Sequence, residues 1–349
     1  MKPSQHAAGA FRSWLRRAHA VPATPTKATP APDASLVNAA TWASQADLIG
    51  LKRHAGSIQL KHAGPARARM AGNHLSRFRG RGMDYQESRA YQSGDDVRSM
   101  DWRVTARTGE PHVKLYQEER ERPVVLFLDL NPGMFFGSRG MLKSVAAARA
   151  AALIAWAVVD CGDRIGAMLF NGGHSDLQPR GGKHGVLRLI SQMVAHTDPR
   201  DGIQADAAEG GLNEALIRLR RVSRPGSLVV LLSDFYGIDD SSGGHLLRLR
   251  QHCDVVAIQI VDPLELAPPT AARYAIAAGD QQGVLDTRTD GARRAYQDYF
   301  SRHHEVVATT MRKNAIALLQ LSTADNIETA LRGYFAAGTN HARGARGVP

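Results

Sequence analysis

Residues 123–138 of this 349-residue chain read PVVLFLDLNPGMFFGS. The five apolar residues at 124–128 are enough for a strand buried on both faces but too few for a stable helix. This run ends at Asp129, and the turn-forming triplet Asn131-Pro132-Gly133 follows. Because a helical pattern begins near Met141, the stretch predicts a strand, a loop and a helix, with a carboxylate at the mouth of the loop.

Strand and helix patterns alternate through the rest of the chain. Further apolar strands are expected at residues 165–170, 228–232, 255–261 and 316–321. Helices are expected at residues 142–159, 186–194 and 212–222, around 246, at 296–307 and ending at 331. Such alternation is typical of a doubly wound, mostly parallel α/β sheet with helices on both faces. We predict this domain over residues 123–338, with a hairpin or irregular stretch near 274–285.

The N-terminal third has a different composition. Residues 1–35 contain five prolines among Ala and Thr and offer little apolar surface, so we predict a disordered tail, and a second one at 339–349. Residues 36–122 hold a helical pattern that ends at Gly50, followed by short alternating segments, glycine pairs and dense charge. This pattern predicts a helix and a β-rich module, with Trp102 in its core.

The positive charge is concentrated at the N-terminal end. Residues 1–122 carry 20 Lys and Arg against 11 Asp and Glu, whereas residues 123–349 carry 24 against 22. A basic segment of this kind can bind nucleic acid, an anionic membrane surface or an acidic protein, and its charge does not choose among them.

The remaining composition favours a folded cytoplasmic protein. The apolar and charged fractions, 43% and 22%, are ordinary for a globular chain. No apolar run reaches the roughly 18 residues that a membrane span needs, and the first twenty residues lack the continuous apolar segment of a secretory signal. The two cysteines, Cys161 and Cys253, each adjoin an apolar run, and we expect both to be buried thiols in a reducing compartment.

Two of the predicted strands end in an acid. Asp129 closes one apolar run, and Asp234 follows the run at 228–232. The carboxyl ends of parallel strands meet at one edge of a sheet, so we expect these side chains to lie close together. With oxygens from nearby loops they could hold a hard cation such as Mg²⁺. An acid at a strand end can equally cap the loop that follows, and the sequence leaves both interpretations open.

Three longer motifs point to a family. Residues 79–85 read RGRGMDY, residues 94–107 read GDDVRSMDWRVTAR, and KLYQEER follows at 114–120. These segments resemble the signature of the bacterial domain-of-unknown-function family fifty-eight, over roughly residues 70–335. The resemblance implies a von Willebrand A-like domain preceded by a β-rich segment. Because members are often encoded beside MoxR-type AAA+ ATPases, it also implies an adaptor or co-chaperone that works with such an ATPase on a client protein.

The resemblance also suggests a degenerate metal site. Relatives with a metal-ion-dependent adhesion site use Asp-x-Ser-x-Ser, a distant Thr and a distant Asp. Asp129 and Asp234 match the two acids, but Asn131 and Gly133 stand at the serine positions and Lys183 at the threonine. Glycine offers no side-chain oxygen and an ammonium repels a cation. We therefore hypothesise that Lys183 lies between the two acids in place of Mg²⁺, and that all five residues form a metal-free edge for docking a partner.

A second predicted contact surface lies in the N-terminal module. Six charged residues are expected to contact the A-like domain or a partner, namely Arg81, Asp95, Asp96, Arg98, Asp101 and Arg103.

The sequence predicts no catalytic residue. Residues 181–183 read GGK but lack the spacing of a phosphate-binding loop, and neither a nucleophile elbow nor a zinc-ligand spacing occurs. We therefore predict a non-enzymatic adaptor without a cofactor. The alternative is a nucleic-acid-binding protein that uses the basic N-terminal half, while a metal-dependent hydrolase is disfavoured because no base or nucleophile accompanies the two carboxylates.

Overall fold

The structure is a computed structural model, and it describes residues 39–58, 83–118, 123–171, 173–203, 211–278 and 281–344. Contacts group residues 39–58 with the chain from 123 onward into one unit, the sheet domain, while residues 83–118 form a second, the hairpin unit. The predicted tail at 1–35 lies outside the described residues. Of the predicted tail at 339–349, the first part is helical, because the last helix, α13, continues to Gly344.

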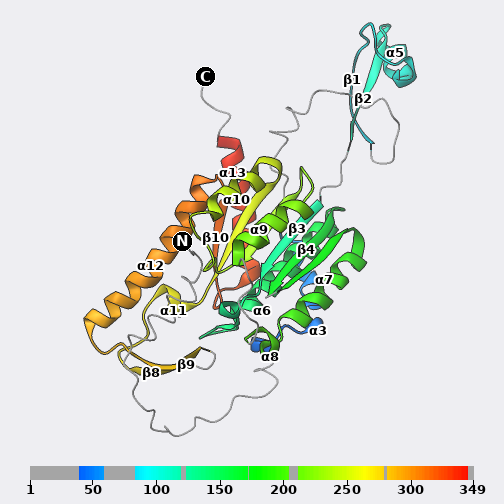
Figure 1. The fold of residues 1–349 in the computed structure, drawn as a ribbon. Coiled ribbons are helices and arrows are strands. Elements are labelled where there is room, and N and C mark those ends of the chain that lie inside the picture. The colour runs from blue at the N-terminus through cyan, green and yellow to red at the C-terminus, as the bar shows by residue number, and fades with distance from the viewer. Residues whose placement is uncertain are drawn as a thin grey trace. The chain divides into compact units, whose positions relative to one another are not determined.

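The sheet domain is built on six strands (Figure 1). They are β3 Pro123–Asp129, β4 Arg164–Asn171, β5 Gly173–Arg180, β6 Leu228–Ser233, β7 Asp254–Val261 and β10 Ala317–Ser322. Their order is β10-β7-β6-β3-β4-β5, and all are parallel except the edge strand β5. Counted along the chain this is the order 3-2-1-4-5-6 of doubly wound sheets, so the predicted α/β class with a mostly parallel sheet is confirmed.

Helices cover both faces of the sheet, as Figure 1 shows. On one face lie α3 Gln45–Gly50, α4 Lys52–Ala55, α6 Lys143–Asp160, α7 Gly182–His196 and α13 Ile327–Gly344. On the other lie α9 Gly211–Val222, α10 Ser242–His252 and α12 Asp290–Lys313. Shorter elements connect them: the 3-10 turn η2 Pro132–Phe135, α8 Pro199–Gly202, α11 Pro263–Leu266, and the hairpin β8 Arg273–Ala278 with β9 Gln281–Asp286.

The central strand β3 divides its side chains between the two cores. Val124, Leu126 and Leu128 pack toward α6, and Val125 and Phe127 pack toward α9 and α10. All five are at most 4% exposed, which is why this strand is a continuous apolar run and does not alternate with polar residues.

The segment at 39–58 belongs to the sheet domain, which corrects the predicted grouping of residues 36–122 into one module. The indole of Trp42 donates to the carbonyl of Val194 in α7 at 2.8 Å, and the indole of Trp156 in α6 donates to the carbonyl of Leu48 at 3.1 Å. Leu48 is fully buried between these helices. The predicted unit at 36–122 is therefore split, because its helical part completes one face of the sheet domain.

The hairpin unit contains an antiparallel pair, β1 Met83–Ala90 and β2 His112–Glu118. Between the strands lie the 3-10 turn η1 Val97–Ser99 and the helix α5 Trp102–Thr108, which ends at Gly109 with φ of 77°. The described part of the predicted β-rich module is thus one hairpin and one helix. Trp102 is 67% exposed, so the prediction that it is a core residue is wrong. α5 buries none of its residues, because two strands and one short helix do not enclose a core around it.

Two further expectations concern the surface. Among the helices in the described ranges, none combines the length and the apolar character that crossing a bilayer requires. Cys253 is buried as expected, but Cys161 is exposed, because it stands at the end of α6 where the chain turns toward β4.

Candidate functional site

The two acids that end apolar strands lie at one edge of the sheet. Asp129 is the last residue of β3, and Asp234 follows β6. The strands pair in parallel, with Leu128 opposite Leu232, so their carboxyl ends share this edge. Between β3 and β6 the strand order also reverses, and open α/β sheets place their ligands at this point. Both acids are buried, with exposures of 2% and 5%.

A buried lysine lies against Asp234. Lys143 is the first residue of α6 and is 1% exposed. Its Nζ donates to Oδ2 of Asp234 at 2.8 Å and to Oε1 of Glu265 at 2.9 Å. Burial alone would lower the pKa of Lys143, but the attraction of the two carboxylates outweighs this effect and raises the pKa above its ordinary value. Lys143 is therefore a permanent ammonium between two acids.

Glu265 is positioned by the acid that follows the next strand. Asp262 comes after β7 and accepts from the N–H of Leu264 at 2.9 Å, while Glu265 accepts from the N–H of Asp262 at 3.1 Å. These reciprocal bonds are a capping box at the start of α11. Asp262 also accepts from the N–H of Ser138 at 2.7 Å and from the hydroxyl of Thr323 at 3.0 Å. Three neighbouring parallel strands thus end in buried acids, and the third of them fixes the loops of this edge.

Asp129 is held by neutral donors. Its Oδ1 accepts from the backbone and side-chain amides of Asn131 at 3.1 and 2.5 Å, and its Oδ2 accepts from the hydroxyl of Ser233 at 2.6 Å. Burial raises the pKa of Asp129 and the charge of Asp234 raises it further, while the hydrogen bonds from Ser233 and Asn131 lower it. The resulting pKa is about 7. The folded protein therefore favours the protonated form of Asp129.

An aromatic pair borders the ion pairs. The ring of Tyr236 stacks on His303 with 3.9 Å between centroids, and Nζ of Lys143 lies 5.4 Å from the centroid of the Tyr236 ring. Nε2 of His303 donates to the carbonyl of Asp234 at 2.9 Å. Burial lowers the pKa of His303, which favours its neutral ring. The charged groups are thus enclosed on this side by apolar ring surface.

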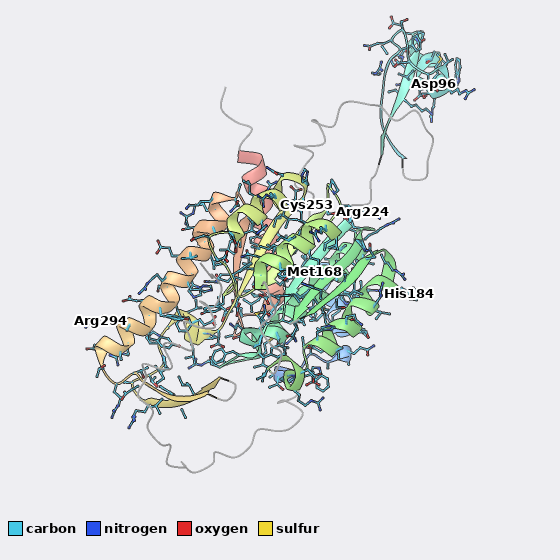
Figure 2. The ribbon with its side chains drawn as sticks, viewed as in Figure 1. Asp96, Met168, His184, Arg224, Cys253 and Arg294 are labelled. Atoms are coloured by element: carbon cyan, nitrogen blue, oxygen red, sulfur yellow. The ribbon has the colours of Figure 1, made fainter. Side chains whose placement is uncertain are left out.

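Lys183 lies at the opposite edge of the sheet, so the hypothesis that it lies between the two acids is wrong. It is exposed in the first turn of α7, where Figure 2 labels its neighbour His184. β5, which precedes α7, is antiparallel to β4, and Arg180 at its end pairs with Ile165 near the start of β4. Because β4 is parallel to β3, the end of β5 lies at the amino edge, away from Asp129.

Asn131 and Gly133 do lie at the predicted edge, in the loop after β3. Both amides of Asn131 donate to Asp129. Gly133 is exposed, and a Cβ at this position would lie 3.2 Å from Oδ2 of Asp234, so the loop backbone packs closely over that carboxylate. The edge therefore unites four of the five predicted residues, and Lys143 lies there against Asp234 and Glu265.

These residues do not fit a divalent cation. Mg²⁺ requires several oxygen ligands at short range in a near-octahedral arrangement. Here Oδ2 of Asp234 is bonded to the Lys143 ammonium, both oxygens of Asp129 accept hydrogen bonds, and Gly133 offers no side-chain oxygen. Across the described ranges, no three or more His, Cys, Asp and Glu side chains are grouped so that they could hold a metal ion.

The six charged residues predicted as a second contact surface have different roles. Three acids serve the hairpin unit itself: Asp95 pairs with Arg89 at 2.8 Å, Asp96 caps η1, and Asp101 caps α5. Figure 2 labels Asp96 in this unit. Arg98 and Arg103 are exposed, and Arg81 lies outside the described residues.

Sequence reasoning missed Lys143 and Glu265. Lys143 precedes a long apolar helix and follows the same loop as Asp129, so a charged residue at the mouth of a buried helix was the available signal. Glu265 stands in Asp262-Pro-Leu-Glu265, an acid followed three residues later by Glu, which is the pattern of a capping box.

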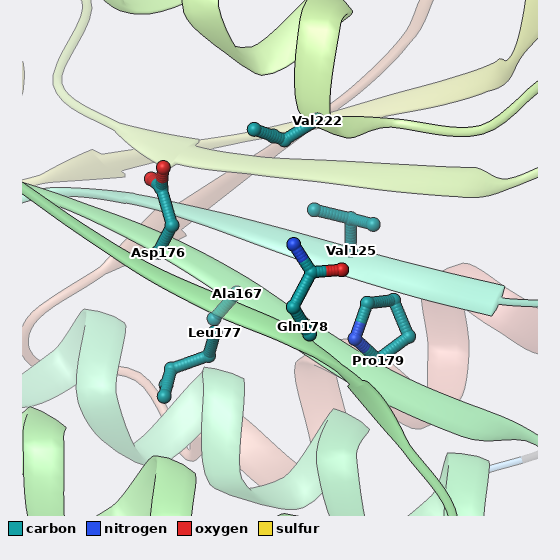
Figure 3. A pocket seen from close by; sticks show the side chains of 7 residues that line it. All are labelled: Val125, Ala167, Asp176, Leu177, Gln178, Pro179 and Val222. Carbon is teal, nitrogen blue, oxygen red and sulfur yellow. The ribbon is translucent and has the colours of Figure 1, made fainter.

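A small hollow elsewhere in the sheet domain is unrelated to this edge. Figure 3 shows its lining side chains, which are Val125, Ala167, Asp176, Leu177, Gln178, Pro179 and Val222. Its volume of about 10 Å³ holds at most one water molecule, so it is a packing defect beside the edge strand β5.

Comparison with known proteins identifies relatives without an assigned function. A family described as "Protein of unknown function DUF58" matches residues 87–306. Uncharacterised proteins from Mycobacterium bovis and Mycobacterium tuberculosis are 34% identical over 261 residues, which cover 72% of this chain and 78% of each relative.

The solved structures that this chain is similar to are more distant. The conserved hypothetical protein BatB from Bacteroides thetaiotaomicron is 14% identical with a TM-score of 0.39, over 64% of this chain and 99% of that chain. A mutant of the PilB minor pilin from Streptococcus sanguinis is 10% identical with a TM-score of 0.30, over 67% and 65% of the two chains. Likeness at this level has no bearing on function.

Proposed function

The chain belongs to the DUF58 family of proteins of unknown function, and we propose that it is a non-enzymatic adaptor that works with a MoxR-type AAA+ ATPase on a client protein. The partner class comes from the family resemblance. The strand order, with acids at the ends of β3 and β6, supports a von Willebrand A-like domain whose degenerate adhesion site lies at the switch point.

The proposal rests on one observation: the polar side chains of this site form hydrogen bonds and ion pairs with one another. Lys143 bonds Asp234 and Glu265, and Asn131 and Ser233 bond Asp129. Groups that bond one another in a buried cluster are poorly placed to bind a substrate or to transfer its protons. They are well placed to hold the loops of the edge in one shape, which is what a docking surface needs.

The rim of the edge offers a contact surface. Phe136, which directly follows η2, is 44% exposed, and Arg139 in the same loop is exposed. The backbone N–H of Lys143 donates to the backbone carbonyl of Phe136 at 2.9 Å, so the first residue of α6 also holds the exposed loop in place. An apolar ring beside an arginine favours a partner surface with an apolar recess and an acidic border.

The nucleic-acid alternative gains no support from the described residues. The hairpin unit at 83–118 carries five Lys and Arg against seven Asp and Glu, so the basic excess of the N-terminal third lies in residues 1–82. A phosphate backbone is bound through many neutralised charges, and this unit presents no such surplus.

The test is co-purification with the MoxR-type ATPase of the native host in the presence of ATP. We expect the wild-type protein to bind, and Phe136→Ala to weaken binding at least several-fold without loss of stability. Leu247→Ala is the matched control, because Leu247 is 49% exposed on α10. Absence of any association between the wild-type protein and the ATPase would refute the adaptor proposal.

A further inference from the structure

The hairpin unit presents an exposed tryptophan beside arginines. Trp102 is 67% exposed and Val97 is 58% exposed, although both are large and apolar. Val97 begins η1 and Trp102 begins α5, so a short turn separates them. Trp and Arg are the residues most enriched at the energetic centres of protein interfaces. We use the name Trp102 face for Trp102, Arg103 and Arg107, which are exposed on α5, together with Val97 and Arg98 of the preceding turn η1.

Two acids beside this face, Asp95 and Asp101, are engaged within the unit. Asp101 is 5% exposed and accepts from the N–H groups of Arg103 and Val104 and from the hydroxyl of Ser88. The carboxylate of Asp95 accepts from the guanidinium of Arg89 at 2.8 Å. These carboxylates therefore fold the unit, and their charge is directed to groups within it.

The guanidinium groups of the three arginines are available to an external partner. Arg98, Arg103 and Arg107 are exposed, and in the ranges that the structure describes no hydrogen bond or ion pair engages their guanidinium groups. Arg103 and Arg107 are four residues apart on α5, so they lie on one side of the helix, next to the ridge that begins at Trp102. The face thus combines two exposed apolar side chains with three exposed arginines.

We infer that the Trp102 face docks on an acidic protein surface with an apolar recess. The inference rests on the proposed function for the identity of that partner, which is then the MoxR-type ATPase. A protein is favoured over nucleic acid because the unit as a whole has more acids than bases, seven against five over residues 83–118. The adaptor then has two contact surfaces, the edge at Phe136 and the Trp102 face.

The experiment measures the affinity of the full-length protein for the purified ATPase with ATP, by biolayer interferometry. Trp102→Ala should weaken binding by about 30-fold or more, as expected for an interface hot spot. The double variant Arg98→Glu/Arg103→Glu should also lose binding, and wild-type binding should weaken with added salt. The matched controls are Leu247→Ala and Arg221→Glu, because both residues are exposed on helices of the sheet domain. The controls should bind like the wild type.

The possible outcomes separate this inference from the proposed function. If the wild type binds and Trp102→Ala binds equally well, the face is not the contact, while the adaptor proposal stands. If the wild type does not bind, the proposed function fails, and a photocrosslinking residue at position 106, exposed one turn after Trp102 on α5, decides the inference in the native host. Capture of an acidic protein from position 106 but not from 247, abolished by Trp102→Ala and by Arg98→Glu/Arg103→Glu, supports it. Capture of nucleic acid, or no adduct above the control, overturns it.

Discussion

Replacement of Lys143 by methionine tests whether the buried ammonium holds this edge together. Methionine keeps most of the length and apolar contacts of the lysine but removes its charge. Lys143 is 1% exposed and makes two charged hydrogen bonds at 2.8 and 2.9 Å. Removing one partner of such a buried cluster leaves uncompensated carboxylates, which typically costs about 3–5 kcal/mol.

The assay is urea unfolding of the purified protein, followed by tryptophan fluorescence. With a slope of about 2 kcal/mol/M, the expected loss lowers the midpoint by about 1.5–2.5 M. Lys183→Met is the matched control, because Lys183 is exposed, and its free energy of unfolding should change by less than about 0.5 kcal/mol. In Lys143→Met the acids Asp234 and Glu265 have lost their cation, so millimolar Mg²⁺ or Mn²⁺ should restore part of the stability by binding the folded state.

Two results would refute this reasoning. If Lys143→Met unfolds within about 1 kcal/mol of the wild type, the buried ion pairs do not stabilise the edge. If Lys183→Met is the more damaging variant, the lysine near the acids is the one expected from the sequence, and the placement of β5 is wrong.

Two other variants probe the same edge. Burial and the charge of Asp234 raise the pKa of Asp129 from 3.8 to about 7, so this group favours the protonated state in the folded protein and its contribution to stability falls as the pH rises from about 4 to about 7. Asp129→Asn cannot ionise, so its free energy of unfolding in urea should exceed that of the wild type at pH 8 by up to roughly 4 kcal/mol, and should differ little from it at pH 4. A lower free energy of unfolding at pH 8 would contradict the raised pKa of Asp129. Gly202→Ala should cost about 1–3 kcal/mol, because its Cβ would lie 1.9 Å from the ring of Phe135 behind the docking loop. Gly244→Ala, where nothing lies within 4 Å of the added Cβ, is its control, and equal stability of the two variants in thermal melts would show that the loop is not packed as described.

The sequence predicts the sheet and its acids because both depend on local patterns. An apolar run such as 124–128 can only be a buried strand, and an acid after it must lie at the carboxyl edge once the strands are parallel. Asp129 and Asp234 were therefore found without knowledge of the packing.

The placement of Lys183 failed because one strand was not predicted. β5 has the sequence GHSDLQPR, and only Leu177 in it is buried, so it shows no apolar run. An unpredicted antiparallel strand reverses the direction of the chain, and the loop after it moves to the other edge of the sheet. Lys143 was missed because the side chain is enclosed only by tertiary contacts, from Asp234, Glu265 and Tyr236, which are distant in sequence.

Trp102 is the reverse case, because it was predicted to be buried and is exposed. An aromatic residue in a charged, glycine-containing segment was predicted to be core because apolar side chains are usually buried. The hairpin unit is too small to enclose it, so its exposure depends on the size of the unit and not on the local pattern.

We propose that the ammonium of Lys143 takes the place of a metal ion at the switch point between β3 and β6. Calorimetric titration of the wild-type protein with Mg²⁺, and then with Mn²⁺, tests it most directly. We predict no saturable heat of binding with either ion. Tight binding of one ion per chain that disappears in Asp129→Ala would contradict the claim.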